Sequence, residues 1–319
     1  MSEMKFLDDT LKLLEQVNQV YPGSVILRGQ GEASGIITHD QVTTEMLETR
    51  LMVEVTDATA PDFQATHELL HMLLTLSGFP QVYFQLKTGD EDVTNQLMVM
   101  ATYLYRPALH AIIYREQAKH GLLTAEVAEA YAKGVMTTLT KETPGNRDEA
   151  ALRLLTLLDA KVFMHNVPTD TTAFTATFMD AFPEAWQGAT LIFDQMAIDH
   201  IVDAFTLHQA IVTAFDGFDA MMITWQLPEL NSKEFTTVTP VLSERQLRLP
   251  VAQVFDIKHV DLLNQVTGDT AYVGLQKSSG QNSFVLAAPK EATADWFKEL
   301  YAMSVQDLFD QMKQPFTMR

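Results

Sequence analysis

Apolar residues near the start of the chain recur first at helical and then at strand spacing. Residues three and four apart lie on the same side of a helix, and one such apolar face is expected to end before Tyr21. Its members are Leu7, Leu11, Leu14 and Val17. Residues 24–27 form a short apolar run, and residues 50–55 alternate between apolar side chains and Met52 or Glu54. The pattern therefore predicts a helix followed by two strands.

A second helix is predicted over Pro61–Ser77. Pro61 follows a turn-forming stretch that begins at Asp57, and proline is favoured in the first turn of a helix. Gly78 is placed to close the helix. Apolar residues surround it on nearly all sides, which is typical of a buried central helix. They are Leu69, Leu70, Met72, Leu73, Leu74 and Leu76.

The rest of the chain shows helical spacing as far as Gln226 and shorter apolar runs after it. The helical stretches are 90–160, 185–215 and 217–226. Breaks in the first stretch are expected at Pro107, Gly121, Gly134 and residues 144–146. Strands are predicted at 82–86, 236–239, 247–254, 270–275 and 283–286, and two final helices at 292–303 and 304–312. These patterns predict a mainly helical α+β protein.

Composition narrows the class of protein. The chain has 319 residues, 47% of them hydrophobic, which is enough to bury a core. Its 41 acidic and 22 basic residues give a formal net charge of −19, and such a chain is repelled by nucleic-acid backbones and anionic lipid. Because no apolar run could span a bilayer and the start lacks a leader pattern, we expect a cytoplasmic protein with no nucleic-acid or membrane partner. The absence of cysteine excludes disulfides and thiolate metal ligands, so a bound metal would have to use His, Asp or Glu.

The residues with the clearest chemistry lie inside the helix predicted at Pro61–Ser77. His67 and His71 are one helical turn apart, so both imidazoles can face one ion. Glu68 lies between them, close enough to polarise a water bound to that ion without being aligned to coordinate it. Two neutral imidazoles and a third nitrogen or oxygen ligand leave an open water position on Zn²⁺. The spacing predicts a zinc site with His67 and His71 as ligands and Glu68 as general base. The alternative is that all three side chains make ordinary hydrogen bonds.

The run His67-Glu68-Leu69-Leu70-His71 resembles the motif of the zincins, the HExxH metallopeptidases. The resemblance covers the strand at 50–55, the helix with the motif and a following helix. It implies that an extended peptide lies beside the sheet edge and presents its carbonyl group to the ion. We therefore expect a zincin-like metal domain over residues 1–165, a helical extension over 166–230 and a small α+β unit over 231–319.

Two residues compete for the place of third ligand. Glu91 lies twenty residues after His71, as in thermolysin-like zincins, but the residues around it match the pattern of those enzymes only loosely. Acidic residues are also common at helix starts, because they favour the helix dipole. His110 lies in an apolar helix that can pack against the helix with the motif. We expect His110 as the third ligand, with Glu91 as the alternative.

A longer resemblance connects four segments to a family of lactic acid bacteria that carries the label IpaB/EvcA. The segments are 67–80, 154–160, 241–249 and 280–286. This resemblance spans most of the chain, but it implies no activity.

The function predicted from these residues is hydrolysis of a peptide bond by metal-activated water. Glu68 would take the proton, and His67, His71 and His110 would hold Zn²⁺. The partner would be a peptide or protein substrate. The alternative is a non-catalytic protein, either a metal-stabilised interaction module or a degenerate zincin that binds a peptide without cutting it.

Overall fold

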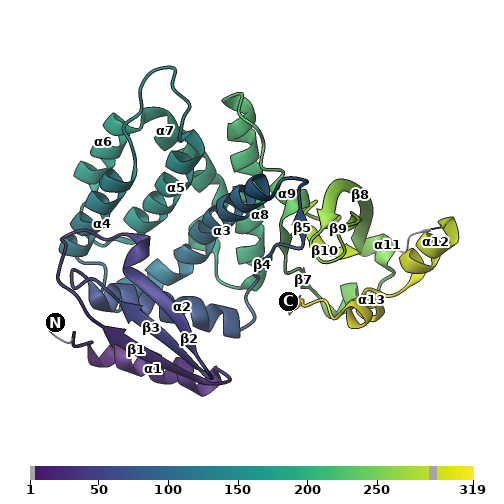
Figure 1. Ribbon diagram of the computed structural model, residues 1–319, viewed down its shortest axis with the longest axis horizontal. Helices are drawn as coiled ribbons and strands as arrows, with labels where there is room; N and C mark the ends of the chain where they lie inside the picture. The colour runs from purple at the N-terminus through teal and green to yellow at the C-terminus, as the bar shows by residue number, and fades with distance from the viewer. Residues whose placement is uncertain (1–3, 287–292) are drawn as a thin grey trace. The chain divides into compact units, whose positions relative to one another are not determined.

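The computed structural model describes residues 4–286 and 293–319, and it confirms a mainly helical α+β protein (Figure 1). The chain forms two compact units, each assembled from two separate stretches of sequence. Unit 1 contains Met1–Ser77 and Leu109–Phe193, and unit 2 contains Gly78–Ala108 and Asp194–Arg319. The division of the chain at residues 165 and 230 stays a prediction.

Unit 1 begins with a helix, a three-stranded sheet and a second helix that packs on both (Figure 1). The elements are α1 (Asp8–Val20), β1 (Ser24–Gly29), the 3₁₀ helix η1 (His39–Gln41), β2 (Val42–Leu47), β3 (Arg50–Val55) and α2 (Pro61–Leu76). The central strand β3 runs parallel to β1 and antiparallel to β2. Residues from α1, the sheet and α2 meet in one buried cluster of Val17, Val25, Val53 and Leu69.

The first helix, the strands β1 and β3, and α2 confirm the predicted pattern, whereas β2 was not predicted. Its sequence, Val-Thr-Thr-Glu-Met-Leu, is largely exposed, so it carries no apolar face toward a core. The expectation that α2 is buried on nearly all sides is wrong for its second half. Phe63 and Leu69 are buried, but Leu73 and Leu74 are only half-buried and Leu76 is exposed.

Three further helices and parts of two others complete unit 1. They are the later residues of α3 (Glu91–Lys119), then α4 (Ala125–Thr138), α5 (Ala150–Asn166), α6 (Thr172–Ala181) and most of α7 (Pro183–Met196). The predicted breaks at Gly121 and near Pro144 are confirmed, because α3 and α4 end just before them.

Two of the predicted helix breaks are wrong. The helix α3 runs through Pro107, although proline has no N–H to donate to the preceding turn. The helix α4 runs through Gly134. Glycine is needed there because the backbone of Ile37 approaches the helix closely, not because the chain turns. A Cβ at Gly134 would lie 1.8 Å from the carbonyl oxygen of Ile37. The Ile37 N–H also donates to Ala130 O at 3.0 Å, which fixes this contact.

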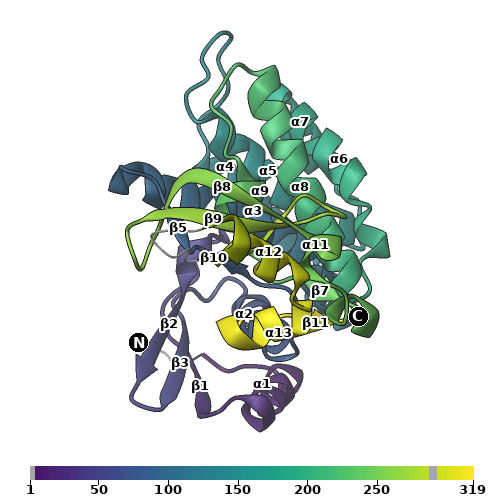
Figure 2. The same cartoon turned by 90° about the vertical axis from the view of Figure 1, so that its right-hand side faces the viewer.

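Unit 2 combines one long helix with a four-stranded sheet and several short elements (Figure 2). It contains α3 as far as Ala108 and the last residues of α7. Its other helices are η2 (Ile198–His200), α8 (Ala204–Thr224), α9 (Ser232–Phe235), α10 (Glu244–Leu247), α11 (Val251–Val254), α12 (Ala294–Ala302) and α13 (Val305–Met312). Its strands are β4 (Val82–Tyr83), β5 (Leu86–Lys87), β6 (Thr237–Val238), β7 (Val241–Leu242), β8 (Phe255–Asn264), β9 (Thr270–Gln276), β10 (Asn282–Leu286) and β11 (Thr317–Met318). The larger sheet has the order β10-β9-β8-β5.

The structure corrects several predictions in unit 2. Residues 247–254 form no strand, because Ser243 and Gln246 make a capping box that starts α10 and Pro250 precedes α11. The predicted strand at 82–86 is divided into β4 and β5, and the helical stretch at 185–215 is interrupted between α7 and α8. The predicted helix start at residue 292 lies outside the described residues. Within the described residues, we find no helix with both the length and the apolar character needed to cross a bilayer.

Candidate metal centre

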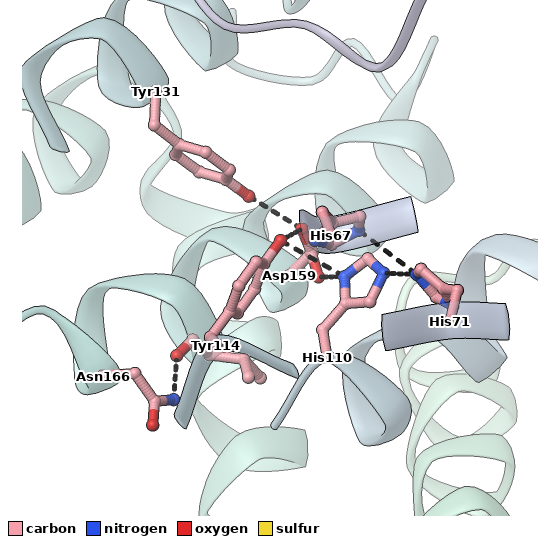
Figure 3. A network of polar contacts seen from close by, with 8 residues as sticks. His67, His71, His110, Tyr114, Tyr131, Asp159 and Asn166 are labelled. Carbon is pink, nitrogen blue, oxygen red and sulfur yellow. Dashed lines mark hydrogen bonds and ion pairs between the residues drawn. The ribbon is translucent and has the colours of Figure 1, made fainter. Parts of the chain in front are cut away.

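Three imidazoles converge in unit 1 (Figure 3). His71 Nε2 lies 3.2 Å from His67 Nε2 and 3.0 Å from His110 Nε2. One nitrogen from each ring lies within 4.8 Å of the others, which makes the three a group able to hold a metal ion. The helix α2 supplies two of the rings and α3 supplies the third. The structure therefore brings His110, but not Glu91, together with the two histidines of the motif.

Two of the three nitrogen–nitrogen separations are close to those of a tetrahedral zinc site. Ligand nitrogens about 2.0–2.1 Å from such an ion lie roughly 3.3–3.4 Å from one another. The separations of 3.2 and 3.0 Å are close to this value. Neutral imidazoles are also the nitrogen ligands that zinc prefers. We conclude that the donor set suits the predicted ion, while the identity of the metal stays a prediction.

The ring of His110 is oriented by a buried carboxylate on α5. His110 Nδ1 lies 2.5 Å from Asp159 Oδ1, and His110 is only 1% exposed. This contact puts the ring hydrogen on Nδ1 and leaves the lone pair of Nε2 facing the other histidines. Histidines that bind metals commonly have such a carboxylate behind them. Asp159 is thus suited to hold His110 in its ligand orientation.

Two tyrosines complete the surroundings of Asp159 (Figure 3). The hydroxyl groups of Tyr114 on α3 and Tyr131 on α4 donate to Asp159 Oδ2 at 3.0 and 2.7 Å. Burial favours the neutral acid, but the electrostatic attraction of the His110 ring and the hydrogen bonds from His110 and Tyr131 outweigh it. The pKa of Asp159 therefore lies well below its usual range. Burial and the nearby Asp159 charge raise the pKa of Tyr131, so that phenol remains a donor.

Aromatic packing holds these polar groups in place. Phe63 lies in contact with His67, with ring centroids 6.1 Å apart, and stacks on Tyr114 at 6.3 Å. Phe163 stacks on Tyr131 at 3.9 Å, with an angle of 8° between the ring planes. A rigid apolar surround strengthens hydrogen bonds and limits rotation of the rings.

The other candidate residues lie in different settings. Glu68 follows His67 on α2 and is half-buried, about 60° around the helix from His71 and about 100° from His67 at ideal geometry. Glu91 is exposed in the first turn of α3, where its charge favours the helix dipole.

Sequence reasoning missed Asp159 and Tyr131. Both lie in helical stretches without a local motif, and Asp159 is 49 positions from His110. One signal was present, since a carboxylate in the mainly apolar run Leu154–Ala160 needs a buried partner. A charge at His39 on η1 also lowers the pKa of Asp159, although no motif marks that histidine.

Comparison of the chain with known proteins identifies no family for it. No protein-family model, curated protein or solved structure matches the chain. The function must therefore be inferred from the site itself.

Proposed function

We propose that this protein is a zinc-dependent hydrolase of peptide bonds with a zincin-like catalytic unit. The observation that carries the proposal is the convergence of three imidazole nitrogens, one of them oriented by a buried carboxylate. His67, His71 and His110 hold the ion in this proposal. When bound, zinc supplies a Lewis acid that makes its water acidic and polarises the substrate carbonyl.

Glu68 acts as the general base. It accepts a proton from the attacking water and returns it to the amine that leaves when the peptide bond breaks. Its place on α2, directly after one ligand and three residues before the next, supports this role. Asp159 keeps the Nδ1 hydrogen of His110 engaged, so that Nε2 stays available as a ligand.

The sheet edge beside α2 offers a place for an extended substrate. The strand β2 pairs with β3 on one side only, and five of its six residues are exposed. An unpaired strand edge presents backbone N–H and C=O groups that can pair with an added strand. The helix α2 contacts both β2 and β3, so a peptide on this edge would lie near the helix with the histidines. The net charge of −19 favours neutral or basic peptides.

A purely structural metal site is the second candidate, and exposure argues against it. Structural zinc sites are closed by four protein ligands, whereas catalytic sites keep one position open. His67 and His71 are half-buried rather than fully enclosed, and the group contains three histidines. These features favour an open position over a closed one.

The test separates metal binding from turnover. Under zinc-replete conditions, we expect wild type to retain about one zinc per chain by elemental analysis and His67→Ala to lose it, because two imidazoles bind far more weakly than three. His120→Ala, which changes an exposed histidine of the same unit, is the matched control and should retain zinc. Wild type without zinc would overturn the proposal.

Turnover is tested with Glu68→Gln and a peptide library. We expect this variant to keep zinc and to lose at least about a hundredfold in cleavage rate, because the base is gone while the ligands remain. Glu129→Gln, an exposed change on α4, should cleave like wild type. If wild type binds zinc and cleaves nothing, the protein is a non-catalytic metal-binding module instead.

A further inference from the structure

A buried amide near the end of α3 connects that helix to α2. Gln117 is 1% exposed, and its Nε2 donates to Phe63 O at 2.7 Å and to Thr66 Oγ1 at 2.8 Å. The Thr66 hydroxyl donates to Asp62 O, so its oxygen is an acceptor for Gln117. Both amide hydrogens are used, and this fixes which end of the amide is nitrogen. Two hydrogen bonds therefore hold the end of α3 to the first two turns of α2.

Gln117 lies on the same face of α3 as the histidine of the metal centre. It follows His110 by seven residues, which is two helical turns, and Tyr114 lies between them on that face. The matching face of α2 carries three residues spaced four apart, Phe63, His67 and His71. The contact between the two helices is therefore a pair of facing rows of side chains.

The two rows meet in opposite order along the helices. At one end, His71 Nε2 lies 3.0 Å from His110 Nε2. In the middle, the rings of His67 and Tyr114 have centroids 5.5 Å apart (Figure 3). At the other end are the hydrogen bonds of the Gln117 amide. The amide thus fixes the end of the row opposite to the metal centre.

These hydrogen bonds determine how far α3 is shifted along α2. A buried polar contact can fix the register of packed helices, because any other register leaves its donors unpaired. A shift of one helical turn would move His110 by about 5.4 Å and take its Nε2 away from the other two imidazoles. His110 also lies three residues after Pro107, which cannot donate to the preceding turn and therefore weakens the helix there. The position of His110 thus depends on contacts made beyond it along α3.

We infer that Gln117 is a positioning residue of the metal centre, which fixes α3 on α2 so that His110 meets the two histidines of α2. This role depends on the proposed zinc site but not on peptide hydrolysis. It differs from that of Asp159, which orients the His110 ring. Gln117 instead places the backbone of the helix that carries the ring.

The test compares zinc affinities, measured by competition with a chelator. Gln117→Met keeps a side chain of similar length and volume but has no donor. We expect its zinc affinity to be at least about fivefold weaker than that of wild type, because only part of the population then has the register that binds the ion. Gln187→Met, at an exposed glutamine of α7 in the same unit, is the matched control and should bind zinc like wild type.

A second background separates positioning from a general loss of stability. In His110→Ala the remaining two ligands both lie on α2, so their spacing does not depend on α3. Adding Gln117→Met to His110→Ala should leave the residual zinc affinity unchanged within about twofold. An equal loss in both backgrounds would overturn the inference, since the substitution would then act on α2 or on folding rather than through His110.

Thr66→Val is the milder variant and decides the matter if Gln117→Met does not fold by circular dichroism. It removes one of the two acceptors and should weaken zinc binding at least about threefold, again only when His110 is present. Absence of zinc from wild type would overturn the proposed zinc site and this inference together. If wild type holds zinc and the folded variants bind it as tightly as Gln187→Met does, this inference alone is wrong.

Discussion

Asp159 determines which nitrogen of His110 is free to bind an ion, and its removal should weaken metal binding. In Asp159→Asn the neutral amide replaces an ionised acceptor 2.5 Å from His110 Nδ1. Changes to such supporting carboxylates typically reduce metal affinity about 10–100-fold. We expect a loss in that range, measured by competition for zinc with a chelator.

The control for this prediction is Asp180→Asn, which changes an exposed aspartate of the same unit paired with Lys141. Its zinc affinity should equal that of wild type. If Asp159→Asn binds zinc as tightly as Asp180→Asn does, then the carboxylate only fills space beside His110.

At this scale the sequence predicted the two histidines and the glutamate of α2, because one helical turn brings them together without any tertiary information. His110 could be ranked above Glu91 but not assigned, because its position depends on how α3 packs against α2. Asp159 could not be assigned, since nothing near it in sequence indicates that its partner lies on another helix.

Among the helices and strands, the contact between α4 and the segment before η1 leaves no room for a side chain at Gly134. Replacing a helical glycine with alanine normally stabilises a helix by about 0.8–1.0 kcal/mol. Here the added Cβ would meet Ile37 O at 1.8 Å. Overpacking of this kind typically costs about 1–3 kcal/mol. We expect Gly134→Ala to lower the free energy of unfolding, measured with urea.

Gly89→Ala is the matched control, because a Cβ at Gly89 has no neighbouring atom within 4 Å. It should leave the free energy of unfolding unchanged within about 0.5 kcal/mol. A stabilised Gly134→Ala would mean that the α4 contact is looser than the structure has it.

Elements with clear end signals were predicted well, and elements that depend on partners were not. Pro61 and Gly78 delimit α2 in the sequence as they do in the structure. The long strand β8 escaped prediction, because its register shifts between Val260 and Leu263 and this interrupts the apolar alternation. Pro107 did not end α3, so packing along that helix outweighs the lost hydrogen bond.

At the scale of the whole molecule, we expect the folded protein to lose stability in mild acid because His208 is buried. This histidine of α8 is 5% exposed, and burial lowers its pKa to about 4 from an ordinary value of 6.5. The unfolded chain therefore binds a proton before the native protein does. The stability that neutral His208 contributes is complete above pH 6.5 and declines as the pH falls toward 4. Between about pH 7 and about pH 4.5 we expect a loss of roughly 2 kcal/mol from this group.

The measurement is urea unfolding at both pH values for wild type and His208→Leu. The variant should show a pH dependence smaller by roughly that amount, because it has no proton to bind at this position. His120→Leu, at an exposed histidine, should keep the pH dependence of wild type. Identical pH dependence in all three proteins would contradict the prediction.

The compact units are each built from distant stretches of the chain, so reading along the sequence does not reveal them. This has a consequence for the order in which the metal centre can form. Its residues extend from α2 to Asp159 in α5, and proteins are synthesised from the N-terminus. The first two histidines leave the ribosome long before the carboxylate that orients His110. The nascent chain therefore cannot assemble the complete centre until α5 has emerged, by which point most of unit 1 has been made.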